Sequence, residues 1–234
     1  MKLSIVIPCY NEAATLETLV GRVLAADVLG LERELVIVDD ASSDDSFTRA
    51  EALAADNESI VVARHAANRG KGAAVRTGFG LASGDVLVVQ DADLEYDPAD
   101  YGKLLAPILN TGADVVYGSR FRGGDSTRVL YFWHSVGNRV LTQLSNMFTD
   151  MNLSDMECCY KVFRREVLER ITLNEDGFGF EPEITAKISR LQPRPKIYEV
   201  GIGYAGRTYE DGKKITWRDG VWAIWCILRY NLFG

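Results

Sequence analysis

The sequence predicts an α/β protein in which helices cover both faces of a mostly parallel central sheet. Over the first half of the chain, five short apolar runs alternate with longer amphipathic segments, a pattern typical of successive β-α-β units. The 234 residues, 47% of them hydrophobic and 25% charged, are enough for one hydrophobic core. We therefore expect a single domain that comprises residues 1–234.

Each predicted element is bounded by residues that start or stop it. The strands are apolar runs that end at polar or glycine residues: residues 3–8, 34–39, 59–63, 85–90 and 114–118. The helices between them have apolar side chains at helical spacing: about residues 13–26, 44–55, 72–82 and 100–110. Beyond residue 120 the alternation stops, and we expect a helix over about 132–146, a mixed segment over about 155–171 and a helix from Glu181.

The tail of the chain carries an apolar segment, residues 221–228, followed by Arg229. It is shorter than the roughly 18 apolar residues that a membrane-spanning helix needs. Such a pattern fits a core helix, its commoner use, or an amphipathic helix that lies on a membrane surface.

Composition excludes several classes of protein. The chain has 26 Lys and Arg against 33 Asp and Glu, a formal charge of -7, so we expect no nucleic-acid partner. Four cysteines without CxxC spacing and only two histidines predict neither a disulfide framework nor a zinc module. The first apolar run is broken by Pro8 and is too short for a signal peptide, so we expect a cytoplasmic protein.

Polar segments follow the first four predicted strands: PCYNE (8–12), DDASSD (39–44), NRGKG (68–72) and DADLE (91–95). Ligands of open α/β sheets bind at the carboxyl ends of the strands, so these segments predict one shared polar cleft. The first segment lacks the glycines of a dinucleotide-binding turn, and the third lacks the spacing of a P-loop. A dehydrogenase and an ATPase are therefore disfavoured.

Asp91 and Asp93 are the sharpest local signal. Two carboxylates at a strand end offer hard oxygen ligands to Mg²⁺ or Mn²⁺, which in turn holds a diphosphate. An isolated D-x-D tripeptide is usually a pair of solvated turn aspartates, but here three other polar segments accompany it.

In this arrangement the chain resembles the family 2 inverting glycosyltransferases. The resemblance is carried by residues 6–12, 38–44, 68–72, 91–93 and 118–121. The second half more narrowly resembles the polyprenyl-phosphate sugar synthases of the dolichyl-phosphate mannosyltransferase type, through residues 155–161 and 207–215. The resemblance implies a nucleotide-sugar-binding glycosyltransferase A-type fold, with residues 1–119 as the nucleotide-binding half and 120–234 as the acceptor-binding half.

The resemblance also implies site residues, carried over where the motifs match. Those for the donor are Pro8, Tyr10, Glu12, Val38 and Asp40 around the base and ribose, Asp91, Ala92, Asp93 and Glu95 around the metal and diphosphate, and Arg120, Arg207 and Lys214. Arg207 and Lys214 match a loop that closes over the phosphates in the family, whereas Glu95 departs from the Gln that relatives often carry. Asp93, Asp155 and Arg207 are the implied catalytic residues, and Asp91 and Asp93 the metal ligands.

Local positive charge between residues 118 and 139 predicts an anionic acceptor, because four arginines face one acid in a protein that is acidic overall. A phosphate monoester is largely dianionic near neutral pH and fits such a patch. We assign Arg120, Arg128, His134 and Ser135 to acceptor binding. His134 departs from the Arg that relatives commonly place before the phosphate-contacting Ser. The aromatic run 131–133 fits an isoprenoid or bilayer contact, or the protein core.

The predicted function is inverting transfer of a sugar from a GDP- or UDP-linked donor to polyprenyl phosphate. It would use Mg²⁺ or Mn²⁺ and reach the inner face of the membrane by peripheral contact or a partner protein. A phosphate acceptor needs no base, so Asp155 would orient a substrate. With a polysaccharide or other hydroxyl acceptor, Asp155 would be the candidate general base.

Two further alternatives are a non-catalytic nucleotide-binding module and a nucleotidyltransferase, although residues 8–12 lack the glycine-rich turn of the latter.

Overall fold

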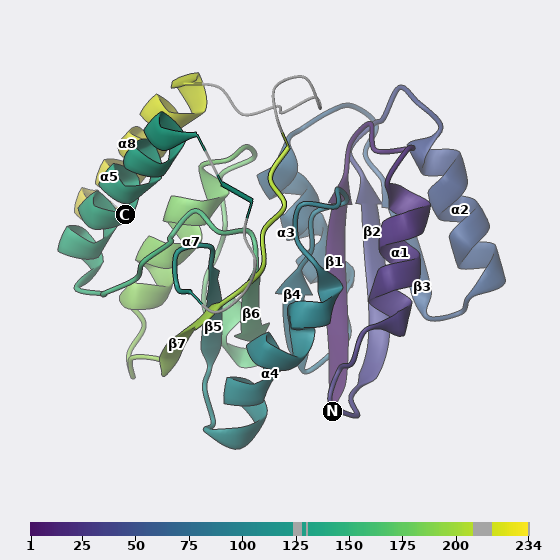
Figure 1. Cartoon of the computed structure of the whole chain (residues 1–234), viewed down its shortest axis with the longest axis horizontal. Coiled ribbons are helices and arrows are strands. Elements are labelled where there is room, and N and C mark those ends of the chain that lie inside the picture. Colours follow the sequence, from purple (N-terminus) through teal and green to yellow (C-terminus); the bar gives the residue numbers. More distant parts are fainter. Residues whose placement is uncertain (124–127, 130, 208–216, 234) are drawn as a thin grey trace.

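The computed structural model describes residues 1–123, 128–129, 131–207 and 217–233. Within this part, one seven-stranded sheet has the order β3-β2-β1-β4-β6-β5-β7 (Figure 1). The strands are β1 (Lys2–Cys9), β2 (Glu32–Asp39), β3 (Ile60–Arg64), β4 (Val86–Val89), β5 (Val115–Ser119), β6 (Lys161–Arg164) and β7 (Ile197–Gly201). All neighbouring strands are parallel except where β6 pairs antiparallel with β4 and β5. The prediction of a mostly parallel sheet is confirmed.

Most helices fall close to their predicted positions, whereas α6 (Arg165–Leu168) lies within the segment predicted as mixed. They are α1 (Leu16–Ala25), α2 (Ser46–Asp56), α3 (Lys71–Leu81), α4 (Tyr101–Asn110), α5 (Phe132–Thr149), α6 (Arg165–Leu168), α7 (Phe180–Ser189) and α8 (Trp217–Leu232), with a short 3-10 helix, η1 (Pro98–Asp100).

Alternation along β1 explains why helices cover both faces of the sheet. Ile5 and Ile7 belong to the large hydrophobic cluster that includes the apolar residues of α1 and α4. Val6 points to the opposite face, in a second cluster with Val38 and α3. A Cβ atom on Gly78 would lie 2.3 Å from Val6 Cγ1, so this glycine allows α3 to approach β1 closely.

Strand β6 inserts between β4 and β5, although it comes after both strands in the chain. Its register pairs Val162 with Val88 on one side and with Val116 on the other. Because β6 runs antiparallel to both neighbours, its first residue lies at the sheet edge where β4 and β5 end. Residues before β6 are therefore brought to the edge that carries the predicted cleft.

Helices α5, α7 and α8 gather beside the β5–β7 half of the sheet (Figure 1). The inner face of α8 is buried at Ala223, Cys226, Ile227 and Tyr230, whereas its outer face exposes Trp217, Val221, Trp222 and Trp225. The tail is thus a core helix on one side and an exposed apolar surface on the other. No helix in the described ranges has the length and hydrophobicity to cross a membrane.

The aromatic run before and within α5 is not part of the core. Tyr131, Phe132 and Trp133 are 48%, 70% and 78% exposed. Of the two interpretations of this run, burial in the core is therefore wrong.

Candidate active site

A cavity of about 880 Å³ lies where β1, β2 and β4 end. Its walls contain residues from all four polar segments predicted to form a cleft: Pro8, Tyr10, Glu12, Asp40, Asn68, Gly70, Lys71, Asp91, Ala92, Asp93 and Glu95. The four segments are brought together because parallel strands place their carboxyl ends at one edge of the sheet.

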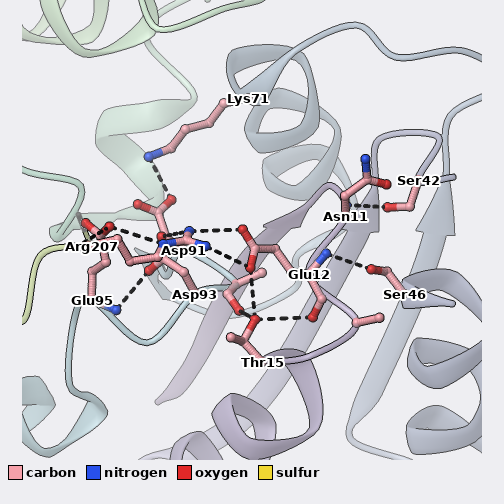
Figure 2. Close-up of polar contacts among 12 residues, drawn as sticks. Asn11, Glu12, Thr15, Ser42, Ser46, Lys71, Asp91, Asp93, Glu95 and Arg207 are labelled. Atoms are coloured by element: carbon pink, nitrogen blue, oxygen red, sulfur yellow. Dashed lines mark hydrogen bonds and ion pairs between the residues drawn. The ribbon is translucent and has the colours of Figure 1, made fainter. Parts of the chain in front are cut away.

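Short hydrogen bonds between neighbouring loops hold the first wall of the cavity. The backbone N–H of Asn11 donates to Ser42 Oγ at 3.0 Å, and that of Glu12 donates to Ser46 Oγ at 2.8 Å (Figure 2). Asp40 accepts from the backbone N–H groups of Arg69 and Gly70 at 2.9 and 2.6 Å. Asp40 thereby ties the NRGKG loop to the end of β2.

Two cations hold the acidic residues at the centre of the cavity (Figure 2). The Arg207 guanidinium lies 2.6 Å from Asp93 Oδ2, 3.0 Å from Glu12 Oε1 and 3.2 Å from Glu95 Oε1. Lys71 Nζ lies 2.7 Å from Asp91 Oδ1. Burial, together with the nearby charges of Asp91 and Glu95, raises the pKa of Asp93 to about 7 despite the ion pair with Arg207.

The carboxylates of this cluster fit a divalent cation. Asp91 and Asp93 offer hard oxygen ligands. Burial raises the pKa of Asp93 most, and the charges of Asp91 and Glu95, which a cation would offset, raise it further. Among the described residues, no three His, Cys, Asp or Glu side chains converge as a ready-made metal cage. In proteins, one or two carboxylates together with substrate phosphates commonly hold Mg²⁺.

Glu95 fastens the segment after β7 to the acidic turn. Its carboxylate accepts from Tyr204 Oη at 2.5 Å and from the Arg207 backbone N–H at 3.0 Å. Its backbone carbonyl accepts from the Ala205 N–H at 2.9 Å. Residues 204–207 therefore lie against the D-x-D turn, which places the Arg207 guanidinium over it. Lys214, the other residue of the predicted closing loop, lies outside the described residues.

Arg120 lines the cavity and is held by Asp155. Arg120 Nε donates to Asp155 Oδ2 at 2.7 Å and Nη2 donates to Oδ1 at 2.8 Å, while Asn138 Nδ2 donates to Oδ1 at 2.9 Å. Burial alone would raise the pKa of Asp155, but Arg120 outweighs it and lowers that pKa. Asp155 is fully buried and, unlike Arg120, is not in the cavity wall.

The profile of glycosyl transferase family 2 matches residues 4–172. The chain belongs to this family. It is 34% identical over 217 residues to the dolichol-phosphate mannosyltransferase of Pyrococcus furiosus, covering 92% of this chain and 61% of that protein. It is 29% identical over 213 residues to the undecaprenyl-phosphate 4-deoxy-4-formamido-L-arabinose transferase of Aeromonas hydrophila, covering 90% of this chain and 62% of that protein. The family 2 chain thus spans less than two thirds of these curated relatives.

Solved structures share the fold of this family 2 chain. A crystal structure of glucosyl-3-phosphoglycerate synthase from Mycobacterium tuberculosis, with Mn²⁺, UDP and glucosyl-3-phosphoglycerate, superposes with a TM-score of 0.74 at 22% identity. The match covers 98% of this chain and 80% of that chain. Another structure of the same synthase gives a TM-score of 0.75 over 100% of this chain and 82% of that one. The predicted glycosyltransferase A-type fold is confirmed.

Several residues assigned to the site of this family 2 chain lie elsewhere. Val38 is fully buried in the cluster under α3 and does not line the cavity, so a side-chain contact to the donor base is corrected to a core role. Of the residues predicted to bind the acceptor, Arg120 and His134 line the cavity, whereas Arg128 and Ser135 do not. Arg128 instead donates from Nη1 to the Gly206 carbonyl at 2.9 Å, beside the segment that carries Arg207.

The family 2 fold brings to the cavity three further groups that are not among the predicted site residues. Lys71 pairs with Asp91, and only its place in the NRGKG segment singled it out. Glu181, where the sequence predicts the start of a helix, lines the cavity and pairs with the buried Lys161, whereas Glu183 accepts from the Asn174 backbone N–H. Glu157 also lines the cavity; it lies within residues 155–161, a segment that carries the resemblance, but the sequence assigned it no role.

Proposed function

We propose that this family 2 chain transfers a sugar from a nucleoside-diphosphate donor to the phosphate of a polyprenyl lipid, with inversion at C1. The observation that carries the proposal is the convergence of Asp91, Asp93 and Arg207 in one cavity with Arg120. The names of the two curated relatives, one for dolichol phosphate and one for undecaprenyl phosphate, support the acceptor class.

The donor would lie along the sheet edge with its base at the β1 and β2 ends. Pro8, Tyr10 and Asp40 line that part of the cavity. The diphosphate would then reach the D-x-D turn. A GDP-linked and a UDP-linked donor both fit this arrangement.

Charge neutralisation at the leaving diphosphate is the main chemical task. A divalent cation held by Asp91 and Asp93 would supply positive charge at the diphosphate oxygens. Arg207, which now binds three carboxylates, would turn part of its hydrogen bonding to the phosphates when they arrive. Donors aimed at a site where negative charge grows stabilise the transition state.

Arg120 would bind the acceptor phosphate, and Asp155 would position Arg120. An ionised phosphate can attack C1 without a base. Asp155 is fully buried, already accepts hydrogen bonds from Arg120 and Asn138, and has a lowered pKa, so it is poorly suited to remove a proton. The alternative with a hydroxyl acceptor thereby loses the general base that the sequence suggested.

An exposed apolar edge borders the mouth of the cavity. Trp133 and Trp217 both line the cavity and are 78% and 75% exposed. Phe132, Trp222 and Trp225 extend the exposed apolar surface along α5 and α8. We propose that this edge contacts the membrane peripherally at its cytoplasmic face, which would bring a lipid phosphate to Arg120.

The test separates donor chemistry from acceptor binding. Arg120→Gln should keep nucleoside-diphosphate binding within about twofold and lower transfer to a short polyprenyl phosphate by about 100-fold, because the phosphate loses a charge-assisted donor. Arg22→Gln, at an exposed position of α1, is the matched control. Unchanged transfer by Arg120→Gln would contradict the assignment of Arg120.

A further inference from the structure

Glu157 is a carboxylate in the cavity wall without a visible function. Its Oε1 atom is buried and, among the described residues, has no hydrogen-bond partner. An acceptor that is buried without a partner costs folding free energy, so a side chain in this state invites a ligand that can donate a hydrogen bond.

The order of strands places Glu157 between the phosphate and acceptor regions of the cavity. The neighbouring strands β4, β6 and β5 contribute, at one edge, the D-x-D turn, the segment before β6 and Arg120. Glu157 lies four positions before the start of β6 and lines the same cavity as Asp93 and Arg120. In a sugar nucleotide the sugar follows the diphosphate, so a donor laid along this edge brings its sugar to Glu157.

The surroundings of Glu157 leave its carboxylate available. Its electrostatic neighbours are Glu181, Lys161, Arg120 and Asp155. Both cations are already engaged, because Lys161 Nζ binds Glu181 Oε2 and Arg120 binds Asp155. Burial, with the charge of Glu181, raises the pKa of Glu157 to about 7. Near neutral pH the group can therefore accept a hydrogen bond or donate one.

We propose that Glu157 is a specificity-determining residue that binds a hydroxyl group of the donor's sugar. This inference rests on the proposed function and deepens it. A buried carboxylate aimed at a hydroxyl discriminates strongly against a sugar that lacks the hydroxyl, because the carboxylate then stays unpaired. Glu157 would act in donor selection, and it would take no part in bond making.

The test compares binding of intact donors with binding of the nucleoside diphosphate alone. Calorimetry on Glu157→Ala should give about tenfold weaker affinity for the UDP- or GDP-hexose that the wild-type protein binds, and UDP or GDP affinity within about twofold of wild type. The melting temperature of Glu157→Ala should be no lower than that of wild type, because an unpaired buried carboxylate is removed. Glu157→Gln keeps the shape of the side chain and one acceptor oxygen, so its affinity for the donor should lie between those of the wild-type protein and Glu157→Ala. Glu51→Gln, exposed on α2, is the control.

A series of deoxy-hexose donors identifies the hydroxyl. One deoxy donor should bind the wild-type protein about tenfold more weakly than its parent and bind Glu157→Ala with no further loss. The inference is overturned if Glu157→Ala binds the parent donor as wild type does, or weakens the nucleoside diphosphate equally. If the wild-type protein binds no sugar nucleotide, the proposed function fails and the inference fails with it.

Discussion

Arg207 Nη2 lies 2.6 Å from Asp93 Oδ2, although the two residues are 114 positions apart in the chain. The same guanidinium contacts Glu12 at the end of β1 and Glu95 beyond the D-x-D turn. One side chain from the second half of the sequence thus holds three acidic groups of the first half together. Without it, the three carboxylates would repel one another.

Replacing Arg207 separates its proposed role at the leaving diphosphate from its ion pair with Asp93. Arg207→Gln should lower kcat/KM for transfer by about 100-fold, because a donor aimed at the leaving diphosphate is lost. Mn²⁺ measured without donor should bind at least as tightly as to wild type, because Arg207 no longer competes for Asp93. Arg22→Gln serves as the control for charge. Transfer within about threefold of wild type would remove Arg207 from the mechanism.

Asp155→Asn tests positioning against base catalysis. Breaking the buried pair with Arg120 should lower the free energy of unfolding by about 3 kcal/mol. It should also weaken binding of the acceptor, which would be measured as a raised KM for polyprenyl phosphate. Slow hydrolysis of the donor, which needs no acceptor, should persist. A general base would instead show as a lost kcat with unchanged KM, together with loss of the alkaline-rising limb of the pH–rate profile.

Glu34 gives a pH-dependent stability prediction away from the site. It accepts from Lys2 Nζ at 2.8 Å and from the Ser83 N–H at 2.7 Å, and these partners with Ser4 outweigh burial and lower its pKa from 4.5 to about 2. A carboxyl whose pKa is depressed by folding stabilises the protein above its unfolded pKa, and this contribution fades as the pH falls from 4.5 toward about 2.

Glu34→Gln should therefore lower the free energy of unfolding by about 2 kcal/mol at neutral pH and by clearly less near about pH 3. Urea denaturation at both pH values measures the difference. An equal loss at the two pH values would show that the charge of Glu34 is not the source of the stability.

The apolar edge predicts membrane binding without a spanning helix. A Phe132→Ser/Trp225→Ser double variant should bind phospholipid vesicles about tenfold more weakly in a flotation assay, because each aromatic side chain loses apolar contact with the bilayer. The rate at which the double variant transfers sugar to a detergent-dispersed acceptor should fall less than its affinity for vesicles. If the double variant bound vesicles as tightly as the wild-type protein does, this surface would not be the membrane contact.

Deleting the tail is a poor substitute for that double variant. The inner side of α8 is part of the protein, since Tyr230 Oη donates to Glu175 Oε1 at 2.7 Å and Cys226 and Ile227 are fully buried. A truncation before residue 222 should therefore unfold the region around α7, and it cannot isolate the exposed face.

The parallel part of the fold was predictable because its signal is local. The first five strands are apolar runs such as Leu35–Val38, and each is followed by the polar residues that mark its carboxyl end. Strand β6 was missed because it has four residues, begins with the buried charge of Lys161 and pairs antiparallel with strands from elsewhere in the chain. Strand β7 is only half-buried and shows no continuous apolar run.

In the site, as in the fold, residues in local motifs were predictable, whereas contacts between distant segments were not. Asp91, Asp93 and Glu12 line the cavity as predicted because they lie in motifs beside strand ends. The partnership of Arg120 with Asp155 joins residues 35 positions apart, and the position of Glu157 depends on where β6 inserts. Neither is encoded by spacing. Val38 shows the converse, since a residue within a recognised motif can serve the core.

The central claim is metal-dependent transfer of a sugar to a lipid phosphate. The most direct test incubates the protein with Mg²⁺ or Mn²⁺, a panel of UDP- and GDP-sugars and a polyprenyl phosphate in detergent, with Asp93→Ala as the control. We predict a glycolipid, detected by mass spectrometry, that disappears on chelation of the metal and in the control. A glycolipid formed equally by Asp93→Ala, or no glycolipid from any donor while a hydroxyl acceptor is glycosylated, would contradict the account.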